Sequence, residues 1–269
     1  MQQRLVIPVL VTLCALTARA EAQFRAPQPP AVGEDYHVEV GAMFWTPSPE
    51  IVIRFDELGA AGSDVDLVQE FALEDKRFTE FRAVLKPGRK HKVRVQYVPI
   101  RYEAEAFIQR EFVFGGRRFT IGVPASTDIE WNLWRFGYEW DFVSNTHGFL
   151  GLVADLKYNK VSAQIASPAI GAAVADAQAP APGIGVIGRG YLSRNLSVTA
   201  EFVGFKVPDR ITEEFDGEMW DFDIYATVNF GRHVGVQGGY RRLDVEYLVE
   251  EDAGTLKMKG LYWGGVVRF

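Results

Sequence analysis

Four histidines are the side chains of this 269-residue chain best suited to proton transfer or metal binding, and they are His37, His91, His147 and His233. The sequence holds no His/Cys cluster with metal-ligand spacing and no nucleophile elbow. Its glycine-rich stretches lack the strand–turn–helix context of a phosphate loop. These residue types therefore indicate no catalytic centre, no metal site and no cofactor, although chemistry based on carboxylates alone stays open.

Charged residues offer a second kind of site, because many of them alternate with apolar residues. The clearest segment is MWDFDIYATVNF, residues 219–230, in which every second residue is apolar or aromatic. A period of two predicts a strand. Asp221 and Asp223 lie on its other face, where burial against a soluble core would be costly. The segment therefore favours a strand with its apolar face toward lipid and its aspartates toward a polar lumen.

Further segments repeat the alternation, at 134–142, 150–158 and 196–204. In two places the apolar positions change parity along the chain. Pro99 marks the first, and a bulge there would leave Arg101, Glu103 and Glu105 facing inward. The second lies between Tyr240 and Leu243 and predicts that Arg242, Asp244 and Glu246 face inward.

Together these strands predict a charged lumen. Its predicted cations are Arg82, Arg94, Arg101, Arg135, Lys157, Arg189 and Arg242, and its predicted acids are Glu80, Glu103, Glu105, Glu139, Asp141, Asp155, Glu201, Asp221, Asp223, Asp244 and Glu246. Such residues either pair with one another and fill a narrow barrel or line a path for polar solutes. A cation site is a narrower hypothesis for Asp221, Asp223, Asp244 and Glu246, which Arg242, Lys257 and Lys259 would neutralise.

Connections of two lengths separate the predicted strands. Tight turns are expected at 87–90, 144–146, 193–195 and 231–232, and longer loops at 48–76, 108–127, 167–182, 207–217 and 250–255. Within the first loop, DVDLVQEF suits either a strand extension or a short helix. Short turns on one side and long loops on the other are typical of an outer-membrane barrel. We predict an all-β fold: one antiparallel transmembrane β-barrel over residues 36–269, of ten strands (eight or twelve are alternatives), with both termini on the periplasmic, short-turn side.

The N-terminal residues predict export. Residues 1–22 have a basic start, an apolar run and a small-residue cleavage site, so they are expected to form a signal peptide cut after Ala22, or after Ala20. Cys14, the one cysteine of the chain, lies inside it. Residues 23–35 are predicted to be a proline-rich periplasmic leader. The formal net charge of −6 for the whole chain argues against a nucleic-acid partner.

The C-terminal residues YWGGVVRF alternate in the same way and end on an aromatic residue. Leu261, Trp263, Val267 and Phe269 share one face, and this pattern resembles the C-terminal assembly signal of Gram-negative outer-membrane β-barrels. The resemblance implies a place in the cell outer membrane and partners of three kinds: outer-membrane lipid and lipopolysaccharide, the barrel-assembly machinery, and periplasmic chaperones. We expect a monomer. A soluble β-sandwich or a lipocalin-like barrel is the alternative, disfavoured by the one-sided charges.

Function is predicted in three classes. The leading one is a small outer-membrane barrel with a charge-filled, largely occluded lumen and a structural or surface-interaction role. The alternative is a narrow, porin-like channel for ions or small polar solutes. An outer-membrane enzyme is the third, and it is disfavoured because the predicted topology places the histidines beside the periplasmic turns.

Overall fold

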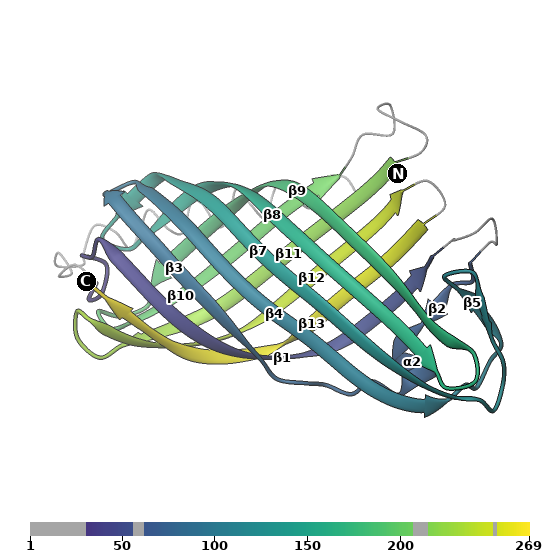
Figure 1. Ribbon diagram of the computed structural model, residues 1–269. Helices are drawn as coiled ribbons and strands as arrows, with labels where there is room; N and C mark the ends of the chain where they lie inside the picture. Colours follow the sequence, from purple (N-terminus) through teal and green to yellow (C-terminus); the bar gives the residue numbers. More distant parts are fainter. Residues whose placement is uncertain (1–30, 56–61, 207–214, 250–251) are drawn as a thin grey trace, which may run out of the picture. The chain divides into compact units, whose positions relative to one another are not determined.

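The computed structural model describes residues 31–55, 62–206, 215–249 and 252–269, and it contains a closed antiparallel barrel (Figure 1). The ten barrel strands are β1 (Val38–Arg54), β3 (Phe78–Gly88), β4 (His91–Phe107), β7 (Pro124–Asn145), β8 (Gly148–Ser167), β9 (Gly171–Tyr191), β10 (Leu196–Lys206), β11 (Phe215–Asn229), β12 (Val234–Val249) and β13 (Asp252–Arg268). Each strand pairs with its neighbour along the chain, and β13 pairs with β1 to close the barrel. The predicted ten-stranded, all-β barrel is confirmed.

One end of the barrel carries the tight turns, as predicted, and we call it the short-turn end. The turns join β3 to β4, β7 to β8, β9 to β10 and β11 to β12. The two described ends of the chain also meet there, because the backbone N–H of His37 donates to the carbonyl of Phe269 at 2.7 Å. Which side of a membrane this end faces stays a prediction.

The opposite, long-loop end carries small additional elements, which with their connecting residues we call the cap. They are β2 (Val65–Asp66), α2 (Leu67–Phe71), β5 (Phe112–Phe114) and β6 (Arg117–Phe119). The Asp66 carboxylate caps α2 by accepting from the backbone N–H groups of Val68 and Gln69, each at 3.0 Å. The segment DVDLVQEF therefore forms both a short strand and a short helix.

Two of the predicted long loops are wrong. Residues 167–182 form most of a hairpin, since β8 runs to Ser167 and β9 starts at Gly171, and β13 already begins at Asp252. The first loop was also placed too early, because β1 continues to Arg54. Alanine, glycine and proline give β9 a loop-like composition, yet Pro180 and Pro182 pair with β8 where β9 has no described strand on its other edge. A proline there interrupts no second ladder.

The predicted bulge at Pro99 is also wrong. Pairing of β4 with β7 continues through Pro99 without a register shift, and the inward parity stays on even-numbered residues. Ile100 and Tyr102 are buried inside the barrel, while Arg101 faces outward with its side chain 53% exposed. After Pro99 the inward face of β4 becomes apolar and its outward face becomes charged, while the strand geometry does not change.

On other strands of the barrel, too, the inward and outward faces exchange polarity between the two halves, and we call this the inversion. In the short-turn half, outward residues such as Trp134, Phe136 and Leu152 are apolar and exposed, as lipid contact requires. In the long-loop half the inward residues are apolar instead, for example Val161 and Leu256. The strands are therefore longer than the apolar belt, and beyond the belt the charged outer face suits water.

Among the described residues, no helix is both long and apolar enough to span a bilayer.

The inversion predicts that one strand tolerates charge differently at its two ends. Leu152→Arg places a cation on the apolar outer face of β8 and should lower the free energy of unfolding in lipid vesicles by about 2–4 kcal/mol. Gln164→Arg, on the same face of β8 but beyond the belt, should change it by less than about 0.5 kcal/mol. Urea titrations followed by tryptophan fluorescence measure both, and equal losses would contradict the inversion.

Candidate functional site

A continuous chain of ion pairs fills the short-turn half of the lumen. We call it the ion-pair chain, and in order of contact its members are Asp223, Arg82, Glu80, Arg241, Asp221, Lys157, Asp155, Arg135, Glu201, Arg94, Glu139, Lys92 and Asp141. All of these side chains are largely buried. Six cations face seven carboxylates, so nearly every charge withdrawn from water has a partner.

Arg241 connects strands that are not neighbours in the barrel wall. Its guanidinium donates two hydrogen bonds to the Asp221 carboxylate, at 3.0 and 2.9 Å, and a third to Glu80 at 2.9 Å. Asp221 lies on the adjacent β11, whereas Glu80 lies on β3, beyond β13 and β1. Such a bidentate pair is among the strongest hydrogen-bonded ion pairs in proteins. Arg241 therefore connects non-adjacent strands across the lumen.

Glu201 has the same role on the other side of the lumen. It is on β10, and it accepts hydrogen bonds from Arg94 on β4 at 2.8 Å and from Arg135 on β7. Arg135 also donates to Asp155 at 2.5 Å, and Lys157 lies 3.2 Å from the same carboxylate. The chain thus crosses the lumen at several points.

Twelve of the eighteen charged residues predicted to face inward do so. Eleven belong to the ion-pair chain, and Arg189 lies nearer the short-turn end. The other six face outward, and they are Arg101, Glu103, Glu105, Arg242, Asp244 and Glu246. Their prediction was wrong because an apolar lumen in the long-loop half was read as a lipid-facing surface.

Two members of the ion-pair chain were missed. Lys92 precedes Arg94 by two residues, so the uninterrupted parity of β4 could have identified it. Arg241 lies opposite Asp223 in the β11–β12 register. The assumed parity switch at Tyr240 hid it and put forward Arg242, whose side chain is 54% exposed and pairs with Asp244 on the outer face at 2.7 Å.

The predicted cation site is wrong for the same reason. Asp221 and Asp223 face the lumen, whereas Asp244 and Glu246 lie on the outer face, where Lys257 pairs with Glu246 at 2.8 Å. Among the described residues, no group of His, Cys, Asp or Glu side chains has a geometry suited to a metal ion.

The last residues of the predicted leader close the lumen at the short-turn end. Glu34 accepts a hydrogen bond from Arg189 at 2.7 Å, and the Val32 backbone N–H donates to Arg194. Burial opposes the charge of Glu34, but Arg189 and the more distant Lys92 and Lys86 hold the pKa of its carboxyl below its ordinary value. Arg268 pairs with Glu39 nearby.

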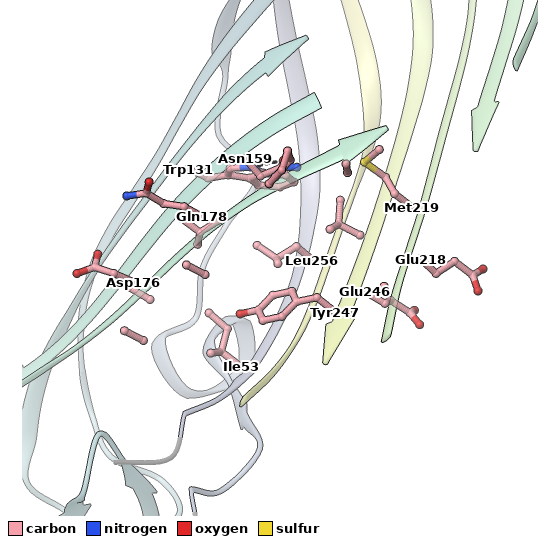
Figure 2. A pocket seen from close by; sticks show the side chains of 18 of the residues that line it. Ile53, Trp131, Asn159, Asp176, Gln178, Glu218, Met219, Glu246, Tyr247 and Leu256 are labelled. Atoms are coloured by element: carbon pink, nitrogen blue, oxygen red, sulfur yellow. Dashed lines mark hydrogen bonds between the residues drawn. The ribbon is translucent and has the colours of Figure 1, made fainter. Parts of the chain in front are cut away.

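The long-loop half of the lumen is apolar and is partly filled by the cap. Phe71, Phe112, Phe114 and Phe119 of the cap are almost completely buried and form one cluster with barrel residues such as Trp131. A cavity of about 290 Å³ remains beside this cluster, and we call it the chamber. Figure 2 shows Trp131 and Asn159 at one end of it and Leu256, Tyr247 and Ile53 along it.

The four histidines lie at the short-turn end, as predicted. His91 contacts the Tyr138 hydroxyl at 2.6 Å, and His233 contacts the carbonyl of Arg268 at 3.0 Å. His37 lies beside Phe269, and His147 lies in the β7–β8 turn. The chamber and the cap contain none of them.

Arg241 and Arg242 are neighbours in sequence that test the two faces of β12. Arg241→Ala leaves Asp221 and Glu80 buried without their shared partner and should lower the free energy of unfolding by about 3–5 kcal/mol. Arg242→Ala removes an exposed ion pair and should cost less than about 1 kcal/mol. Denaturant unfolding of the refolded barrel measures both, and a larger loss for Arg242→Ala would contradict the assigned faces.

No family model and no curated protein sequence matches this chain. Among solved structures, it is similar to the outer membrane protease OmpT from Escherichia coli, with 11% identity, a TM-score of 0.57 and coverage of 91% of this chain and 100% of that one. Ail of Yersinia pestis matches with 11% identity, a TM-score of 0.40 and coverage of 87% and 99%. An outer membrane channel from Pseudomonas putida F1 matches with 10% identity, a TM-score of 0.38 and coverage of 91% and 99%.

Of these three likenesses, only the first has a TM-score above 0.5, and at 11% identity it concerns the fold alone. It agrees with the belt of exposed apolar side chains and with the closed antiparallel sheet. The chain has the fold of the Gram-negative outer-membrane β-barrel proteins.

Proposed function

We propose that this protein is an occluded outer-membrane barrel that acts through its long-loop end, at the cell surface, and does not conduct solutes. The observation that carries the proposal is the ion-pair chain, which crosses the short-turn half of the lumen between non-adjacent strands. A solute that passed through would have to separate buried charges from their partners, and each such separation is costly.

The space left between these side chains supports the same proposal. A cavity in this half of the lumen, beside Arg82, Arg94 and Arg135, has a volume of about 40 Å³. That is room for about one water molecule. A water-filled channel for ions or small solutes, the second candidate, would need a continuous passage at this level.

The cap supports a role at the surface because it has a compact structure of its own. Ser63 and Val113 connect its two loops through a backbone hydrogen bond of 2.9 Å, and Arg110 pairs with Glu70 at 3.3 Å. Outside this core, Phe107 and Ile121 are more than 60% exposed. Exposed apolar side chains on a rigid support are well suited to contact another molecule.

Catalysis is not part of the proposal. The protease likeness lies in the fold, and the histidines that could transfer protons lie at the end opposite to the cap. We propose further that the barrel works as a monomer surrounded by outer-membrane lipid.

Conductance in a planar bilayer tests the occluded lumen. The wild-type protein should show no stable conductance steps, and Arg241→Ala should raise the leak current together with its loss of stability, because it removes a cross-lumen connection. Arg242→Ala serves as the matched control and should behave like the wild type. Large, stable wild-type steps, with an unchanged melting temperature in Arg241→Ala, would favour the channel instead.

Surface labelling tests which end faces outward. The one natural cysteine lies in the predicted signal peptide, so introduced cysteines report their own position. Ile121→Cys in the cap should react with a membrane-impermeant maleimide on intact cells. Leu192→Cys, similarly exposed at the short-turn end, should react only after the outer membrane is broken. The reverse pattern would refute the proposed orientation.

A further inference from the structure

We infer that the chamber is a binding site for a small, uncharged apolar molecule. It lies in the long-loop half of the lumen, and most of its lining is aliphatic or aromatic. Val161 and Ala163 on β8 and Ala175 on the neighbouring β9 line it. Met219 on β11 and Leu256 on β13 line it as well. The inference goes beyond the proposed surface role and does not depend on whether the barrel conducts.

The chamber has a polar floor that is already satisfied. The Trp131 indole N–H donates to the Asn159 side chain at 3.1 Å, and both groups are buried. Lys157, which precedes Asn159 by two residues on β8, belongs to the ion-pair chain. Because these polar groups are hydrogen-bonded to each other, a ligand does not have to supply a hydrogen bond to them. Above this floor the chamber therefore offers mainly apolar contacts.

One wall of the chamber is incomplete among the described residues. Pairing of β9 with β10 ends at Ile184 and Gly204, although β9 continues for another thirteen residues, from Gly171 to Gly183, with β8 as its one described partner. Residues on this free edge of β9, such as Ala177 and Ala181, line the chamber together with Phe205 of β10 and Met219 of β11. Among the described residues, the chamber is therefore bordered on this side by a strand edge.

This free edge begins close to the upper limit of the apolar belt. Tyr158 on β8 is opposite Pro180 of β9, and its hydroxyl donates to Gln178 at 2.8 Å. Trp220 on β11 is opposite Gly204, where β10 leaves β9. Tyr and Trp side chains prefer the boundary between lipid and water. This edge of β9 therefore lies near the expected level of the membrane surface.

The rim and the lining together determine which molecules are suitable. Asp176 and Gln178 lie on the β9 side, and Glu218 and Glu246 lie on the other side (Figure 2). Arg54 is the one cation among the lining residues. Two of the three carboxylates are already paired with cations, Glu218 with Lys206 at 3.3 Å and Glu246 with Lys257 at 2.8 Å. The apolar lining itself disfavours phosphates and carboxylates, and therefore anionic lipids and fatty acids, because burying a charge without a partner is costly. An uncharged molecule meets no such cost.

Size sets the other limit. Cavities of about 150 Å³ with a purely apolar lining stay dry and take up benzene. At about 290 Å³ the chamber has room for a molecule of roughly two fused rings. Naphthalene is a suitable probe because it is uncharged and rigid, and 1-fluoronaphthalene allows its binding to be followed by ¹⁹F NMR.

The experiment compares 1-fluoronaphthalene binding to the full-length mature protein in lipid nanodiscs with its partition into empty nanodiscs. The wild type should show a saturable, additional bound signal. Ala175→Phe fills the chamber and should weaken binding at least tenfold, while Ala154→Phe, on the lipid face of β8, should leave it unchanged. If Ala175→Phe does not fold, as judged by heat-modifiable gel migration, Ala163→Leu replaces it and should weaken binding in the same way.

Two results would overturn the inference. One is no saturable binding by the wild type beyond empty nanodiscs, which would make the chamber a packing void. The other is equal binding by the wild type and a folded chamber-filling variant, which would place the probe elsewhere. A wild type that binds decanoate but not 1-fluoronaphthalene would also contradict it, since the apolar lining would then not exclude an anionic chain.

Discussion

The cost of removing charge from water controls the arrangement of this barrel. The wall encloses six cations and seven carboxylates in the ion-pair chain, and each needs a partner within reach. Because no single pair of neighbouring strands supplies both signs at every level, the pairs extend across the lumen, as from Arg241 to Glu80 and from Arg94 to Glu201. The same contacts that satisfy the charges also hold the wall together and leave little space between the side chains.

A second constraint comes from the length of the strands compared with the apolar belt. Within the belt the outer face must be apolar, so polarity is confined to the lumen. Beyond the belt the outer face meets water, and the lumen takes the apolar residues of a soluble core, including the cap phenylalanines. In the belt, on β7, the charged Glu139 faces the lumen and the apolar Trp140 faces outward. Beyond the belt, on β4, the apolar Ile100 faces the lumen and the charged Arg101 faces outward, without any change in backbone parity.

This inversion explains how much could be predicted from sequence. Alternation within the belt correctly assigned Asp221, Asp223 and their neighbours on β11, because lipid on one side makes the pattern unambiguous. It failed for Arg101 and Arg242, because alternation gives the period of a strand but does not say which face is inside. Beyond the belt the apolar face points into the lumen and the charged face points to water. The pairing of Arg241 with Glu80 is a property of barrel closure, so no local pattern could have revealed it. The small residues of β9 also concealed a strand, because alternation needs side chains of contrasting polarity.

The two halves of the lumen are therefore complementary. Where ion pairs connect the wall across the lumen, it needs no apolar core, and the side chains fill the space almost completely. Where the lumen is apolar, the wall depends on the packing of the cap and of inward apolar residues, a cluster that includes Ala173 and Ala175 of β9. Small residues such as Ala163 and Ala175 leave the chamber open at that point. The ion-pair chain below the Trp131–Asn159 floor keeps the strands in place, so a cavity can persist in the half of the barrel whose described lumen residues are mainly apolar.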